Sequence, residues 1–125
     1  MHKLVRDKVV DNILNRNAKL QTKILNDIQF LNEIKKKLQE EVDELMEVDN
    51  LDKKNLINEL ADIELLIDYI LKVVGITRAD LTKKQINKVS EVGAFNKRIF
   101  VEKVSLQDND KWIEYYKKKG FKEEK

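Results

Sequence analysis

The sequence predicts an all-α fold, an antiparallel helical bundle in which residues 1–125 form a single domain. The 125 residues include no proline and only three glycines, and apolar residues recur at steps of three and four. Charged residues between them make up 38% of the chain. A β-sandwich or barrel would need turn residues at short, regular intervals. A helical chain of this length can bury one modest core.

The N-terminal part is expected to begin as a loop or a short extended piece over residues 3–8 and to continue as a short helix. The helix carries four apolar residues, Val9, Val10, Ile13 and Leu14, and should end near residues 15–17. A first long helix is predicted over 22–48, because its apolar residues follow one continuous stripe. The members of this stripe are Ile24, Ile28, Leu31, Ile34, Leu38, Val42 and Leu45.

A second long helix is predicted over 54–74, after a break at 49–52 that offers N-cap side chains. Gly75 is its expected C-cap. Apolar residues occupy most of its circumference, so we expect it to be the most buried element of the fold. Acidic residues inside this stretch argue against a membrane-spanning helix; they are Glu59, Asp62, Glu64 and Asp68.

Beyond Gly75, two threonines resemble helix starts, Thr77 and Thr82, the latter with Gln85 as a possible capping box. This shorter helix should end near Val89 or Ser90. Residues 93–95 are expected to form a loop, and 99–101 an extended loop or a strand. A last helix, capped by Asn109 or Asp110, should end at Gly120.

Composition excludes several kinds of chemistry. The chain has no cysteine and its only histidine is His2, which excludes thiolate sites and makes a histidine-based triad untenable. The formal net charge of +2 and the lack of a basic stripe argue against a nucleic-acid polymer as partner. No apolar run reaches membrane-spanning length and no apolar signal core is evident, so we expect a cytoplasmic protein with no membrane partner.

Two acidic pairs on the long helices form the candidate site. Glu41 and Glu44 lie on the first helix, and Glu59 and Asp62 lie on the second. Residues three apart on a helix are about 60° apart around its axis and one turn apart along it, so their carboxylates can bind one ion. The short connection makes the helices antiparallel neighbours, which brings the two pairs to the same level.

The positions of these acids relative to the apolar stripes support a metal site. Glu41 borders the stripe of the first helix, Glu59 falls inside the apolar arc of the second, and Asp62 lies next to Val73. A buried bare carboxylate is strongly unfavourable. A hard divalent cation with oxygen ligands, Mg²⁺ or alternatively Mn²⁺, is the simplest counter-charge.

Three further acids lie near the candidate site. Glu40 should project into solvent, whereas Glu64 points into the apolar arc and Asp68 sits on its edge. Each is a candidate supporting group, and Glu64 or Asp68 could instead bind a second metal or pair with a lysine. Either acidic pair alone would most simply be a solvated face. A di-iron carboxylate bundle normally needs Glu-x-x-His pairs, for which the chain has no internal histidine.

The acidic residues Glu40, Glu41 and Glu44, followed by Glu59 and Asp62, resemble the signature of the all-α nucleoside triphosphate pyrophosphohydrolases. That superfamily includes the MazG proteins, the dimeric dUTPases and phosphoribosyl-ATP pyrophosphohydrolase. Residues 4–8, LVRDK, and 93–100, GAFNKRIF, look like flanking motifs of the phosphoribosyl-ATP pyrophosphohydrolase-like, MazG-related branch. Together the three motifs span residues 4 to about 104.

The resemblance implies a MazG-like helical domain that cleaves a nucleotide between the α and β phosphates, giving a monophosphate and pyrophosphate. It implies that Mg²⁺ is held by the catalytic carboxylates Glu41, Glu44, Glu59 and Asp62. Four bases could bind the phosphates of the nucleotide substrate, namely Arg6, Lys8, Lys97 and Arg98. General nucleotide clean-up is the expected role.

Two positions depart from the family pattern. Ala94 stands where a second glycine is expected, and Val9 and Val10 stand where an Ile-Pro is usual. Both departures concern substrate binding and leave the metal site untouched. A homodimer or homotetramer is expected, because a helix that is apolar nearly all round exceeds what one short bundle can cover. The rival hypotheses are a catalytically silent helical-bundle interaction module and a nucleic-acid-binding domain that uses the basic ends.

Overall fold

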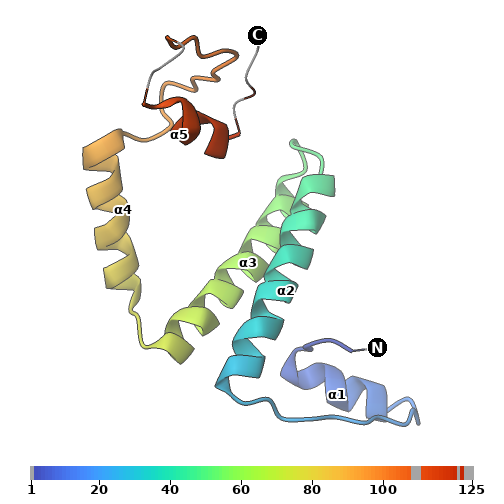
Figure 1. Ribbon diagram of the computed structural model, residues 1–125. Coiled ribbons are helices and arrows are strands. Elements are labelled where there is room, and N and C mark those ends of the chain that lie inside the picture. The colour runs from blue at the N-terminus through green and yellow to red at the C-terminus, as the bar shows by residue number, and fades with distance from the viewer. Residues whose placement is uncertain (1, 108–110, 121, 123–125) are drawn as a thin grey trace. The chain divides into compact units, whose positions relative to one another are not determined.

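The structure is a computed structural model that describes residues 2–107, 111–120 and 122. These residues form five helices and no strand, which confirms the predicted all-α class (Figure 1). The helices are α1 (Asp7–Leu14), α2 (Asp27–Glu47), α3 (Lys53–Val74), α4 (Arg78–Val92) and α5 (Ile113–Lys118). Among the described residues, no helix combines the length and the apolar character needed to cross a membrane.

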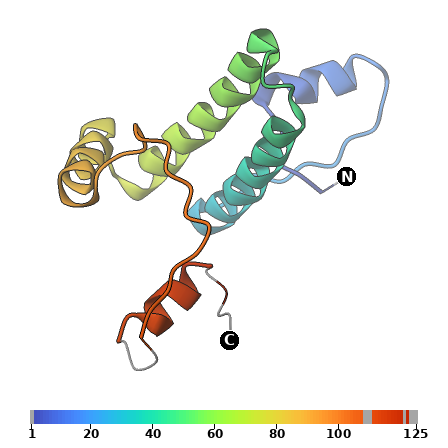
Figure 2. The same ribbon diagram turned by 90° about the horizontal axis from the view of Figure 1, so that it is seen from above.

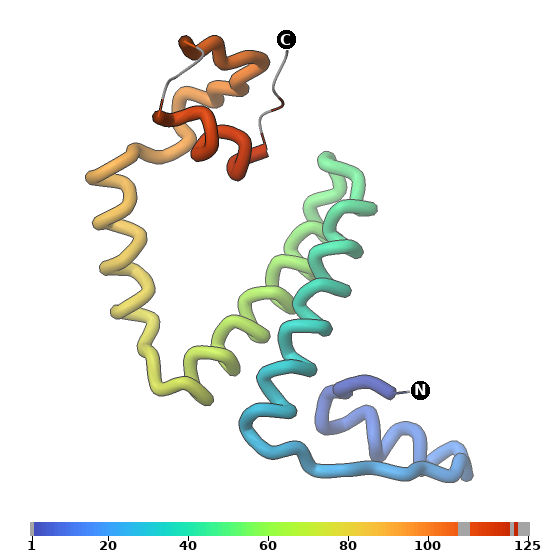
Figure 3. Tube along the Cα trace, in the orientation of Figure 1, coloured from blue at the N-terminus to red at the C-terminus, as the bar shows by residue number. Residues whose placement is uncertain are grey.

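The backbone groups into two compact units, Met1–Ile86 and Asn87–Lys125. The first unit contains α1, α2, α3 and the start of α4, and the second contains the end of α4 and α5 (Figure 3). The predicted single domain over residues 1–125 stays a prediction.

The centre of the first unit is an antiparallel pair of helices, α2 and α3, which lie side by side in both ribbon views (Figures 1 and 2). Apolar side chains are buried in this pair, with Ile34 0%, Leu66 9% and Leu71 8% exposed. Near the open end of the pair, Phe30 and Tyr69 meet edge to face with ring centroids 6.1 Å apart. We call α2, α3 and the turn between them the α2–α3 hairpin.

The start of α2 differs from the prediction. The helix begins at Asp27, five residues later than expected, because Asn26 and Gln29 form a reciprocal capping box. The Asn26 side chain accepts a hydrogen bond from the Gln29 N–H (2.9 Å), and the Gln29 side chain accepts one from the Asn26 N–H (3.3 Å). Ile24 is therefore outside the helix and 95% exposed, and Ile28 is 74% exposed. Their assignment to the apolar stripe was wrong.

The bounds of α3 match the prediction within one residue. The Asp52 side chain accepts a hydrogen bond from the Asn55 N–H (3.2 Å) at the start of the helix. At its end, Gly75 has a φ of 77°, the left-handed conformation that glycine adopts without steric cost. The N–H of Ile76 then donates to the Leu71 carbonyl (2.9 Å), which completes the predicted C-cap.

The later helices were placed less accurately. Of the two proposed starts for α4, Thr77 is correct and Thr82 is wrong. The Thr77 hydroxyl accepts a hydrogen bond from the Asp80 N–H (3.1 Å), and the Asp80 carboxylate accepts one from the Thr77 N–H (3.0 Å). Residues 99–101 form no strand. The proposed caps Asn109 and Asp110 lie outside the described residues.

The expectation that α3 is apolar and buried nearly all round needs correction. One side of α3 faces α2, while other apolar side chains along it remain exposed, among them Ile57 (67%), Leu60 (48%) and Val74 (47%). On α2, Met46 is likewise 78% exposed. Within this unit the hairpin therefore covers only one side of each long helix.

Candidate metal centre

Three of the four predicted ligands come together in the α2–α3 hairpin. Glu41 and Glu44 project from α2 and Glu59 from α3, and each offers a carboxylate oxygen within 4.8 Å of the others. The convergence follows from the three-residue step on α2 and from the antiparallel turn, which brings Glu59 to the same level. We call these three residues the glutamate cluster.

The glutamate cluster extends from the hairpin interior to solvent. Glu41 is only 9% exposed, Glu59 is half-buried and Glu44 is exposed. The Oε2 atoms of Glu41 and Glu59 are buried, and neither has a hydrogen-bond partner among the described residues. Buried carboxylate oxygens are normally hydrogen-bonded or bound to a cation, because desolvation without compensation costs several kcal/mol. Within the described part of the chain, both oxygens therefore lack the partner that their burial requires.

The charge of Glu41 is unfavourable where it lies. Burial of its carboxyl is the largest of several effects that together raise the pKa of Glu41 from an ordinary 4.5 to about 7. The neighbouring carboxylates of Glu59, Glu44 and Asp62 contribute the rest of this rise in pKa. Without a cation, the cluster is thus stabilised by keeping a proton.

This pKa predicts how stability depends on pH when divalent cations are removed. Between pH 4.5 and about 7, native Glu41 keeps a proton that the unfolded chain has released. Stability contributed by this group therefore falls as pH rises through that window and is constant outside it, a loss of up to ~3 kcal/mol. Urea unfolding in EDTA at pH 5 and pH 8 measures the loss, and Glu41→Gln should remove it. An equal pH dependence in both proteins would contradict the assignment.

Asp62, the fourth predicted ligand, is paired with a base. The Arg6 guanidinium donates to Asp62, with Nη2 2.6 Å from Oδ1. Asp62 lies one helical turn beyond Glu59 on α3, and its charge is close enough to act on Glu41. The structure therefore places Asp62 beside the glutamate cluster, but with an arginine as its present partner.

Glu40 is half exposed, as expected for a residue on the outer face of α2. Its carboxylate lies 3.7 Å from the Lys3 Nζ and 4.0 Å from the Lys37 Nζ. The contact with Lys3 was not predicted. The signal for it was the cluster of bases near the N-terminus, but nothing in the spacing connects residue 3 with residue 40.

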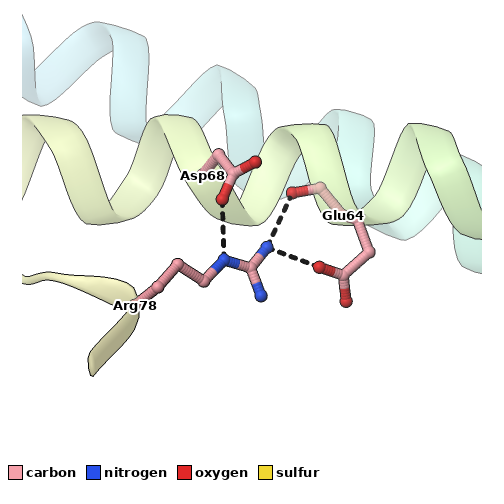
Figure 4. Close-up of polar contacts among 3 residues, drawn as sticks. All are labelled: Glu64, Asp68 and Arg78. Carbon is pink, nitrogen blue, oxygen red and sulfur yellow. Dashed lines mark hydrogen bonds and ion pairs between the residues drawn. The ribbon is translucent and has the colours of Figure 1, made fainter. Parts of the chain in front are cut away.

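The predictions for Glu64 and Asp68 were wrong in their surroundings. Both side chains are more than half exposed, and both are bound by Arg78 at the start of α4 (Figure 4). Arg78 Nε donates to Asp68 Oδ1 (2.8 Å), and Nη2 donates to the Glu64 carboxylate and to its backbone carbonyl. A buried ion pair with a lysine was one of the alternatives predicted for these two acids. The observed partner is an arginine that ties α4 to the exposed side of α3.

The predicted phosphate-binding bases are distributed over both units. Arg6 is at the carboxylates, whereas Lys8 is exposed in the first turn of α1. Lys97 and Arg98 are exposed in the second unit, where Arg98 adopts a left-handed φ of 52°. The role of Lys8, Lys97 and Arg98 stays a prediction. An open hollow of about 780 Å³ in the second unit, lined by residues 99–106 and parts of 113–122, includes none of the predicted site residues.

Comparison with known proteins gives no match: no protein-family model, curated protein or solved structure is significantly similar to this chain.

Proposed function

We propose that the glutamate cluster and Asp62 form a Mg²⁺ site, with Mn²⁺ as an alternative ion, and that the protein is a nucleotide pyrophosphohydrolase. It would cleave a nucleoside triphosphate or related nucleotide between the α and β phosphates, releasing a monophosphate and pyrophosphate. The observation that carries the proposal is a pair of buried oxygens, Glu41 Oε2 and Glu59 Oε2, which have no hydrogen-bond partner within the described part of the chain and belong to a cluster of three carboxylates.

The donor set fits the proposed ion. Every member offers carboxylate oxygen, the ligand that Mg²⁺ and Mn²⁺ prefer, and the chain offers no cysteine and no histidine except the exposed His2. A cation would occupy the space between Glu41, Glu44 and Glu59 and would provide the partner that the two buried oxygens lack. It would also remove the reason for Glu41 to keep its proton. In a protein that never bound a cation, the same clustered carboxylates would only destabilise the fold.

Each residue has a defined role in this proposal. Glu41 and Glu59 would hold the ion from the buried side together with Asp62, and Glu44, the exposed ligand, would accept the proton of the attacking water. Arg6 lies at the edge of the cluster, where its guanidinium can bind phosphate oxygens. When bound, Mg²⁺ supplies charge neutralisation for the leaving pyrophosphate and lowers the pKa of water.

An oligomer of MazG-like type is part of the proposal. The α2–α3 hairpin leaves apolar side chains exposed on both helices, including Met46 (78%), Ile57 (67%) and Leu60 (48%). Exposed apolar side chains on neighbouring helices can form a protein–protein interface. We therefore expect a homodimer or a homotetramer, with the nucleotide as the small-molecule partner.

The test is pyrophosphate release from a panel of standard, deoxy and modified nucleoside triphosphates. We expect release with Mg²⁺ and none in EDTA, and a strong reduction in Glu44→Gln. Glu47→Gln is the matched control, because Glu47 is an exposed glutamate one turn further along α2 and outside the cluster. If no nucleotide is hydrolysed, or if EDTA has no effect, the proposal fails and a non-catalytic interaction module becomes the better interpretation.

A further inference from the structure

The segment before α1 reaches the acidic site at two points. Arg6 is paired with Asp62 on α3, and Lys3 lies 3.7 Å from Glu40 on α2. Leu4 and Val5, between these two bases, are half-buried. Residues 3–6 therefore contact both helices of the hairpin close to the glutamate cluster, and we call them the N-terminal segment.

Arg6 places a positive charge in direct contact with one of the proposed ligands, Asp62. Four carboxylates lie together here, and among the described residues the ion pair that joins them to a base is the one between Asp62 and Arg6. A guanidinium and a divalent cation are attracted by the same carboxylate but repel each other. A cation bound by Asp62 together with the glutamates would thus weaken the contact of Arg6 with Asp62.

The exposure of the pair makes such an exchange feasible. The Arg6 side chain is 59% exposed and that of Asp62 is 27% exposed. A pair open to water on one side is screened and contributes little to stability, so it can be broken at low cost. Glu41 Oε2, by contrast, is buried without a partner among the described residues. Binding of a cation at the glutamates is therefore strongly favoured, whereas the ion pair between Arg6 and Asp62 contributes little free energy.

Resting on the proposed function, we propose that Arg6 is the counter-ion of Asp62 in the metal-free protein and is displaced from it by the divalent cation. The displaced guanidinium is then free, next to the cation, to bind the phosphate groups of the nucleotide. A guanidinium suits this role because it presents paired N–H donors to phosphate oxygens. Metal binding would in this way also break the ion pair that joins the N-terminal segment to α3.

The first test measures Mn²⁺ affinity by titration, without any nucleotide, in five proteins: wild type, Arg6→Gln, Asp62→Asn, the double variant and the control Arg16→Gln. Arg6→Gln should bind Mn²⁺ about threefold more tightly than wild type, since a competitor for Asp62 is lost. In the Asp62→Asn background the same change should have no effect. Arg16→Gln, which removes an equal charge in the exposed turn after α1, should bind as wild type does.

The second test uses the wild-type protein and needs no variant. Trypsin cleavage after Arg6, followed by mass spectrometry, should become faster relative to cleavage after Arg16 when Mn²⁺ is added. Arg16 is exposed and serves as the internal reference.

The outcomes separate this inference from the proposed function. If wild type binds no Mn²⁺, the metal centre and the exchange both fail. If Mn²⁺ binds but Arg6→Gln tightens binding equally with and without the Asp62→Asn change, the charge of Arg6 acts through space and the exchange alone is overturned. The exchange is also overturned if Arg6→Gln leaves the affinity unchanged in both backgrounds, or if bound Mn²⁺ leaves the cleavage ratio unchanged.

Discussion

Glu59→Gln should reduce Mg²⁺-dependent pyrophosphate release by about 100-fold or more, since even residues that only support metal ligands typically cost 10–100-fold. The substitution preserves size and removes the charge of a half-buried carboxylate whose Oε2 has no partner among the described residues. Release measured at saturating nucleotide and several Mg²⁺ concentrations separates weakened ion binding from a slower chemical step.

Stability measurements on the same variant distinguish a metal-binding role for Glu59 from a purely structural one. A structural role predicts that Glu59→Gln is less stable than wild type, whereas a metal-binding role predicts no loss in the absence of a cation. In EDTA, Glu59→Gln should be at least as stable as wild type, because it removes repulsion within the glutamate cluster. Added Mn²⁺ should raise the melting temperature of wild type much more than that of the variant, while Glu47→Gln should behave as wild type in both assays. Full activity in Glu59→Gln would remove Glu59 from the metal site.

Ile34→Ala should lower the free energy of unfolding by about 2–4 kcal/mol. Ile34 lies on α2 and is 0% exposed in the α2–α3 hairpin. Truncation to alanine would leave a cavity in a core that contains few other fully buried apolar side chains. Urea denaturation followed by far-UV circular dichroism measures the loss.

Ile28→Ala is the matched control. Ile28 belongs to the same predicted apolar stripe as Ile34, but its side chain is 74% exposed in the first turn of α2. Its effect should stay within about 0.5 kcal/mol. Equal losses for the two variants would mean that the buried side of α2 has been assigned incorrectly.

Local pattern was sufficient to predict the long helices and the glutamate cluster. The steps of three and four located α2 and α3, and a glycine after the last apolar residue marked the end of α3 at Gly75. The level of Glu59 relative to Glu41 followed from a short turn between antiparallel helices. These features depend on residues close in sequence or on one simple connection, so no tertiary detail was needed.

Features set by side-chain competition or by distant contacts were not predictable. Ile24 fits the apolar period, yet the hydrogen bonds between Asn26 and Gln29 start the helix after it. The pairing of Arg6 with Asp62 joins residues 56 positions apart. The pairing of Arg78 with the exposed acids of α3 depends on the direction in which α4 leaves Gly75, which helical periodicity does not encode.

The two ends of the α2–α3 hairpin are held by different forces. Toward the open end lie the buried apolar residues Ile34, Leu66 and Leu71, whereas toward the turn lies the glutamate cluster. Without a cation, the turn end should therefore open locally while the apolar end stays closed, and its amide protons should exchange faster. A bound ion would join both ends into one cooperative unit. The fraction of molecules in which the turn end of the α2–α3 hairpin is closed would then depend on cation concentration.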